Sequence, residues 1–133
     1  MAFTDIKIDV DKIFDPEHIL QLRKLVNEVY MSPKVEHYVL DVVEATRHPQ
    51  KFGLSDLKDL IQFGVSPRAT LHLTLAARAH ALIQGRGYLQ PQDVKEMAID
   101  CLGHRLIESY HARGRHVNPY TIIQKILDSL EMP

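Results

Sequence analysis

Arg68 is the charged residue whose position most suggests chemistry, because it lies where an apolar helix starts. The stretch "GVSPRATLHL", residues 64–73, joins a Ser66-Pro67 helix start to this arginine. A helix N-terminus already carries about half a positive charge, so the helix itself does not stabilise a cation there. Backbone N–H groups and a guanidinium at one helix end together suit a phosphate. The alternative is an arginine whose stem covers the edge of the core while its charge reaches water.

The pattern of apolar residues places Arg68 on the apolar side of its helix. A helix over residues 67–84 has one apolar stripe, because successive side chains turn by about 100°. We expect this stripe to be buried, and Arg68 lies near its middle, one turn before it begins. The guanidinium should therefore leave the end of the buried face toward a neighbouring element or an open cleft. The stripe consists of Leu71, Leu75, Ala79, Leu82 and Ile83.

Proline placement predicts the other elements that must position this arginine. Proline is favoured at the first helical position, and an apolar stripe with helical spacing follows five of the seven prolines. A shorter helix is expected from Asp56 to Gln62, capped by Ser55. The predicted fold is all-α, a small bundle of five or six helices. Very short extended pieces that pair with one another are expected before Pro33, Pro91 and Pro119. The five helix starts are Asp15-Pro16, Ser32-Pro33, Ser66-Pro67, Gln90-Pro91 and Asn118-Pro119.

Three further signals predict where helices end. His48-Pro49 should end the second helix, because the residue before a proline avoids the helical conformation. Gly85 is placed as the left-handed residue just after the third helix. Gly103 should kink or break the fourth.

Composition excludes several classes of function. The chain of 133 residues has a formal net charge of -1, so no overall attraction to nucleic acid or anionic membranes is expected. Its longest apolar run is far shorter than the roughly 20 residues of a membrane span, and no signal peptide is recognisable. One cysteine, Cys101, allows no intrachain disulfide and favours the cytoplasm.

Other groups of chemically capable residues give weaker signals. The chain has eight histidines, but the best candidate set among them and Cys101 does not have the paired spacing of a structural zinc site, so no metal is expected. Cys101 lies on the apolar stripe of its helix, and core packing is favoured over a role as nucleophile. The basic residues Arg105, Arg113 and Arg115 are expected in a solvated turn, with contact to phosphates or an acidic neighbouring subunit as the alternative. The metal candidates considered are Cys101, His104, His111 and His116.

Residues 63–94, "FGVSPRATLHLTLAARAHALIQGRGYLQPQDV", resemble the C-terminal lid of MoxR-family AAA+ ATPases. Members of that family have a glycine-x-serine-proline-arginine-alanine helix start and then an alanine-rich helix. A glycine-arginine-x-tyrosine turn and a proline-x-aspartate-valine helix start follow. The flanks "HYVLDVVEATRHP" and "AIDCLGHRLI" and the C-terminal "ILDSLEMP" are similar as well. The resemblance covers roughly residues 15–133.

The resemblance implies a function for Arg68. In AAA+ proteins the arginine at this helix start is called sensor two, so Arg68 would reach the β- and γ-phosphates of ATP, with Pro67 near the nucleotide. ATP and Mg²⁺ would be held by an N-terminal P-loop domain of the same polypeptide. This chain contains no GxxxxGK[ST] motif, so alone it is not expected to be an enzyme. Residues 1–14 would then be a linker from the ATPase domain, and residues 15–133 the lid.

The resemblance also implies partners. They are the neighbouring subunits of a ring and, at the level of the family, proteins with von Willebrand A domains that are remodelled in the manner of a chaperone. No nucleic acid and no membrane are expected. Arg47 of "ATRHP" is interpreted either as a helix C-cap or as a residue at a domain or subunit interface.

Two features depart from the family pattern. Gly103 stands where the family usually has an arginine, which weakens any anion-binding role there. The stretch "PQKFGLSDLKDLIQ", residues 49–62, is longer than in many members, and we expect it on the lid surface, away from Arg68.

Two other functions compete with the lid of an ATPase. A small helical binding module, such as a helix-turn-helix reader of DNA, needs polar and basic residues at the start of a recognition helix. The helix starts here are mostly apolar or acidic. An autonomous enzyme would need a nucleophile–base or carboxylate pair, and no persuasive one is present.

Overall fold

The computed structural model describes residues 9–133, in which six α-helices carry most of the chain. Of the expected linker, residues 1–8 lie outside the described residues. The helices are α1 (Pro16–Glu28), α2 (Pro33–Arg47), α3 (Ala69–Ile83), α4 (Pro91–Leu102), α5 (Tyr110–Gly114) and α6 (Pro119–Ser129). Two 3₁₀ helices, η1 (Pro49–Phe52) and η2 (Ser55–Leu60), and two short strands, β1 (Ile61–Phe63) and β2 (Ile107–Glu108), complete the fold. The all-α prediction is confirmed.

Four of the five proline starts behave as the sequence predicts. Pro16, Pro33, Pro91 and Pro119 each begin a helix. The Ser32 hydroxyl accepts from the Val35 N–H at 3.4 Å, and Asn118 accepts from the Thr121 N–H at 2.9 Å. The prediction at Pro67 was wrong by two residues: Pro67 and Arg68 form a tight turn, and α3 starts at Ala69.

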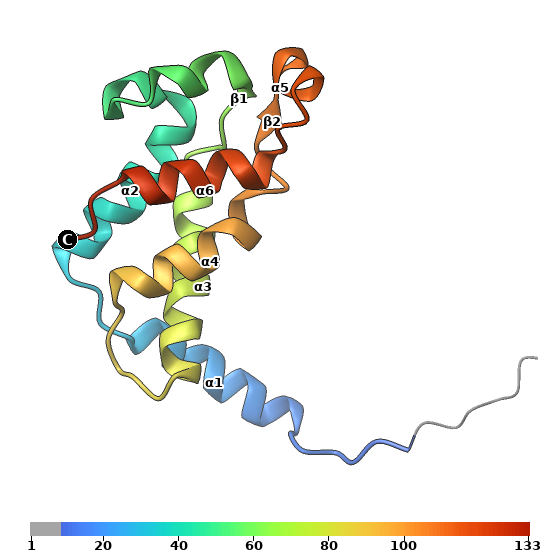
Figure 1. Ribbon diagram of the computed structural model, residues 1–133. Helices are drawn as coiled ribbons and strands as arrows, with labels where there is room; N and C mark the ends of the chain where they lie inside the picture. Colours follow the sequence, from blue (N-terminus) through green and yellow to red (C-terminus); the bar gives the residue numbers. More distant parts are fainter. Residues whose placement is uncertain (1–8) are drawn as a thin grey trace, which may run out of the picture.

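Helix α3 is the axis of the bundle (Figure 1). Helices α4 and α6 cross it on one side, and α2 packs against it, α4 and α6. Helix α1 lies against one end of α3 and carries the chain away from the bundle. The two 3₁₀ helices, β1, β2 and α5 gather near the opposite end. Within residues 9–133, no helix is both long and apolar enough to cross a membrane.

The core lies between α2, α3, α4 and α6. The expected stripes of α2 and α6 are buried, as shown by Val42, Ile122 and Ile126, which have no exposed surface. Helix α1 is different, because none of its residues is buried. Its apolar side chains, among them Leu20 and Leu25, remain about half exposed.

The short extended pieces are only partly as expected. The pieces before Pro33 and Pro91 meet in a parallel bridge between Tyr30 and Tyr88. The piece before Pro119 makes no such bridge. The one sheet within residues 9–133 instead pairs β1 with β2 antiparallel, which the sequence did not suggest.

The segment between α2 and α3 is not the surface elaboration that we expected. The structure forms η2 from Ser55 to Leu60 in place of an α-helix, and no side chain caps it. Leu57 is fully buried and Leu54 and Leu60 nearly so, all within the main core. The prediction failed because these leucines recur every three residues, which is the period of a 3₁₀ helix with one buried side.

The helix ends are as predicted. Helix α2 ends at Arg47 with His48 as its cap. Gly85 adopts a left-handed φ of 75°, and the Arg86 N–H donates to the Ala81 carbonyl at 2.9 Å. Gly103 ends α4, and a side chain there would overlap the ring of Tyr120 on α6.

Candidate functional site

Arg68 occupies the N-cap position of α3, in a turn held by its own hydrogen bonds. The Ser66 hydroxyl accepts from the Arg68 N–H at 3.3 Å, and the Ser66 carbonyl accepts from the Ala69 N–H at 2.8 Å. The Thr70 and Leu71 N–H groups donate to the carbonyls three residues earlier. These amides are therefore engaged within the turn. An anion at this end would be bound by the guanidinium rather than by free backbone N–H groups.

Arg68 is exposed and stands three and seven residues before Leu71 and Leu75, on a face of α3 that is not the buried stripe we expected. The buried face consists of Ala69, Leu73, Ala77 and Ala81. Leu71 and Leu75, which we expected inside, are 65% and 45% exposed. Three alanines let α2 and α4 approach α3 closely, so these small side chains and Leu73 face inward, while Leu71 and Leu75 face outward.

Arg68 is exposed and has no carboxylate partner within residues 9–133. An exposed guanidinium that has no ion-pair partner among these residues, next to exposed leucines, is typical of a surface that contacts another domain. The outward face continues into an apolar groove of about 400 Å³ between α2 and α3. Its walls include Met31, Leu40, Leu71 and Leu75 together with Glu36 and Arg78. The Nε atom of Arg78 is buried and has no hydrogen-bond partner within residues 9–133.

A second cleft, of about 380 Å³, opens beside Pro67. Arg47 and Thr70 also line it, but so do the carboxylates of Asp41 and Glu44, while Arg68 does not. The hydrogen bond from Lys51 holds the pKa of Glu44 below its usual value, so this acid stays charged. Arg68 does not line this cleft, and two carboxylates stand there beside Arg47, so we expect a phosphate to approach Arg68 from the outward face of α3 instead.

The backbone before Arg68 is fastened to the last turn of α2. The hydroxyl of Thr46, which is fully buried, donates to the Val43 carbonyl at 2.7 Å and accepts from the Val65 N–H at 3.1 Å. Arg47 Nη1 donates to the Val65 carbonyl at 3.2 Å. A side chain at Gly64 would overlap the Thr46 carbonyl. His48, rather than Arg47, is the C-cap of α2, and Arg47 instead donates across to Val65; its role at a domain or subunit interface stays a prediction.

The glycine-arginine-x-tyrosine turn and the helix start after it are joined through Asp93, a buried acid that sequence reasoning did not single out. Its carboxylate accepts from Arg86 at 2.8 and 2.5 Å and from the Gln90 N–H at 2.8 Å. His80 Nδ1 lies 2.8 Å from Asp93 Oδ1, and its Nε2 lies 3.1 Å from Glu96 Oε2. The signal was an aspartate three residues after the N-cap, where it can bond back to the cap.

These contacts determine the ionisation of Asp93. Burial alone raises its pKa, but the hydrogen bonds from Arg86, the Gln90 N–H and His80 outweigh burial and lower the pKa to about 2. The charged carboxylate therefore ties the end of α3 to the start of α4.

The other candidates do not form a site. The structure shows no group of three metal-binding side chains in the part of the chain that it describes. Burial raises the pKa of the half-buried Cys101 thiol, which disfavours a reactive thiolate. Arg113 pairs with Glu108 at 3.1 Å and stacks on Tyr110.

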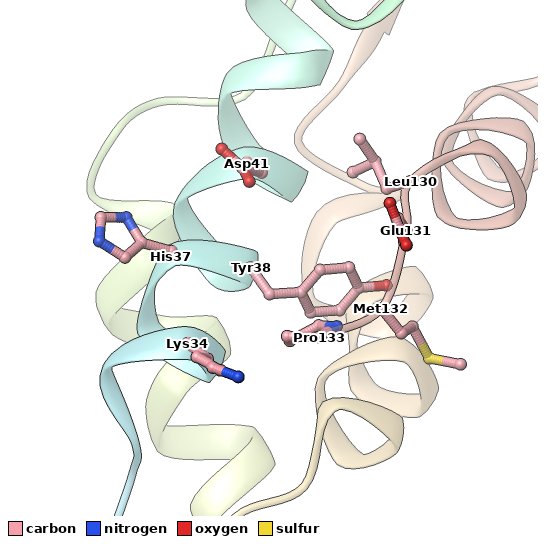
Figure 2. A pocket seen from close by; sticks show the side chains of 8 residues that line it. All are labelled: Lys34, His37, Tyr38, Asp41, Leu130, Glu131, Met132 and Pro133. Atoms are coloured by element: carbon pink, nitrogen blue, oxygen red, sulfur yellow. The ribbon is translucent and has the colours of Figure 1, made fainter.

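Another groove, of about 450 Å³, lies between α2 and the C-terminal segment (Figure 2). Figure 2 shows the Tyr38 side chain pointing from α2 toward Met132, with Lys34, His37 and Asp41 along the helix. Charges of both signs line this groove, so it does not select an anion.

Comparison with known proteins identifies the fold. Residues 55–126 match the family model of the AAA lid domain. The chain is 37% identical over 122 residues to Chaperone MoxR1 of Mycobacterium tuberculosis, covering 92% of this chain and 32% of that protein. It is 42% identical over 99 residues to Protein MoxR of Paracoccus denitrificans, covering 70% of this chain and 29% of that protein.

A solved structure supports the same conclusion. A crystal structure from Cytophaga hutchinsonii, of a protein described as a candidate ATPase, superposes with a TM-score of 0.84 at 35% identity. The match covers 88% of this chain and 36% of that one, so the chain spans about a third of the length of the relatives it matches. The chain belongs to the AAA lid domain family, and within it to the MoxR group of AAA+ proteins.

Proposed function

We propose that the chain is the lid that closes over ATP in a MoxR-type ATPase and that Arg68 is its sensor-two arginine. The observation that carries this proposal is an exposed guanidinium, with no ion-pair partner in the described part of the chain, at the end of a conspicuously apolar outward face. A P-loop domain of the same polypeptide would cover Leu71 and Leu75 and the groove beside them. That contact would bring the phosphates of ATP to Arg68.

ATP and Mg²⁺ would both be held mainly by the P-loop domain, since this chain supplies only one cation to the phosphates. A guanidinium there would stabilise the charge that develops on the phosphoryl group during transfer. Pro67 has no backbone N–H to donate to a phosphate. It would act instead by fixing the backbone conformation of the turn.

The wider proposal follows the relatives. One of them is described as a chaperone, so the ATP cycle would drive remodelling of partner proteins by a ring of subunits. Proteins with von Willebrand A domains are the proposed clients. We also propose a cytoplasmic location, which the single cysteine favours.

Titration with Mg·ATP tests the division of labour between the two domains. The chain alone should bind Mg·ATP with a Kd of about 1 mM or weaker, because one arginine cannot provide micromolar affinity. The chain joined to its ATPase domain should bind about a hundredfold more tightly. Calorimetry measures both values. Micromolar binding by the chain alone would place a complete nucleotide site within it, and salt-sensitive binding of duplex DNA would favour the helix-turn-helix alternative.

A further inference from the structure

We infer that Thr46 and Arg47 are positioning residues, which hold the Ser66–Pro67–Arg68 turn so that Arg68 can meet the phosphates. This inference rests on the proposed function of Arg68. The geometry that carries it is the fastening of Val65, the residue just before the turn, to the last turn of α2.

Both polar groups of the Val65 backbone are held by neighbouring residues of one helix. Its N–H donates to the Thr46 hydroxyl at 3.1 Å, and its carbonyl accepts from Arg47 at 3.2 Å. The Thr46 hydroxyl is itself oriented, because it donates to the Val43 carbonyl at 2.7 Å. A hydroxyl with both roles occupied cannot rotate freely. Val65 is therefore fixed in both position and orientation relative to α2.

Gly64 makes this fastening possible. A side chain at this position would overlap the carbonyl of Thr46 and the Cα atom of Arg47, which are backbone atoms that cannot move aside. The two backbones are in direct contact as a result. The Val65 side chain is fully buried, which adds a third restraint at the same point.

The turn needs such an anchor because α3 begins without a side-chain cap. By contrast, α2, α5 and α6 begin with the capping side chains of Ser32, Ser109 and Asn118. Ser66, Pro67 and Arg68 are all exposed, so an unanchored turn would fray. With Val65 fixed, the hydrogen bonds that the Arg68 and Ala69 N–H groups donate to Ser66 carry the restraint to Arg68.

A purely structural role for Thr46 would predict a different result. Loss of the hydroxyl would then lower stability and leave hydrolysis per folded molecule unchanged, with or without Arg68. A positioning role predicts that the effect on hydrolysis exists only while Arg68 is present. A double-mutant cycle separates these two cases.

The test uses the chain joined to its ATPase domain, with the variants Thr46→Val and Arg68→Ala and their combination. Thr46→Val should lower kcat about tenfold, since a misplaced group can cost up to about a hundredfold. In the Arg68→Ala background the same change should lower kcat less than about twofold. Thr46→Ser, which keeps the hydroxyl, should restore the rate.

A second measurement needs no nucleotide. Hydrogen exchange at the Val65 amide should be slow in the wild-type chain, at least about tenfold faster in Thr46→Val, and slow again in Thr46→Ser. If Thr46→Val perturbs folding, Arg47→Met gives an exposed alternative. It removes the donor to the Val65 carbonyl and should also lower kcat, while Arg47→Lys should recover part of the loss.

The outcomes distinguish the two levels of the argument. If Arg68→Ala leaves hydrolysis unchanged, the proposed function of Arg68 falls and the positioning role falls with it. If Arg68→Ala lowers hydrolysis but Thr46→Val has the same effect in both backgrounds, only the positioning role is overturned. Fast exchange of the Val65 amide in the wild-type chain would also overturn it.

Discussion

Replacement of Arg68 by alanine should reduce ATP hydrolysis by about a hundredfold when the chain is joined to its ATPase domain. Loss of one preorganised donor to developing charge typically has an effect of this size. The stability of the fold should stay nearly constant, because Arg68 is exposed and has no ion-pair partner within residues 9–133. Steady-state hydrolysis and thermal unfolding measure the two effects.

Two control variants make this result specific. Lys125→Ala removes one exposed cation from α6 and should leave hydrolysis within about twofold, as is usual for a substitution at an exposed position. Arg68→Lys keeps the charge but loses the planar fork, so its rate should lie between those of the wild type and the alanine variant. An unchanged rate for Arg68→Ala would remove the basis of the nucleotide assignment.

Replacement of Asp93 by asparagine should destabilise the chain by about 3 kcal/mol, as is typical when one partner of a buried ion pair is removed. The Asp93 side chain is only 2% exposed, and it holds Arg86, His80 and the start of α4 together. Glu96→Gln is the matched control. It changes the other acid that faces His80, is 47% exposed, and should cost less than about 1 kcal/mol. Denaturant unfolding of the chain measures both variants.

The same network predicts a dependence of stability on pH. The pKa of Asp93 is about 2 in the folded chain and 3.8 for the free side chain. A lowered folded pKa adds stability above pH 3.8, and that stability is lost as pH falls toward 2. The loss amounts to about 2 kcal/mol, from 1.36 kcal/mol per pKa unit. Asp93→Asn should lack this part of the acid transition. An identical acid transition in the variant would show that the neighbours of Asp93 do not lower the pKa of its carboxyl group.

Much of the fold could be predicted from the sequence, because its signals are local. Prolines after capping residues located four helix starts, and His48 and Gly85 located two helix ends. The stripe of α6 was predicted correctly because its isoleucines and leucines have no competing apolar face.

The failures have two different physical causes. Helix α3 has two apolar faces, one with Leu71 and Leu75 and one with three alanines and Leu73, and hydrophobicity alone favours the face that has more leucines. The alanine face is inside because close packing of α2 and α4 requires small side chains, which is a property of the neighbours. The face with Leu71 and Leu75 remains exposed. In residues 56–62 the sequence pattern predicts an α-helix, but the leucines have the three-residue spacing of a 3₁₀ helix.

The candidate site was predictable only in part. The Ser66-Pro67-Arg68 motif predicts the turn, and the resemblance to the MoxR family implies that Arg68 is a sensor-two arginine. The contacts of Val65 with Thr46 and Arg47 join residues 18 and 19 positions apart, and no local pattern indicates them. Asp93 carried a local signal, but its three partners come from different elements.

The most direct test of the central claim is a crystal structure of the chain joined to its ATPase domain, with Mg²⁺ and a non-hydrolysable ATP analogue bound. We expect a guanidinium nitrogen of Arg68 within about 3 Å of a β- or γ-phosphate oxygen. Leu71 and Leu75 should be buried against the ATPase domain. Arg68 directed into solvent, or paired with a carboxylate while other residues bind the phosphates, would contradict the account.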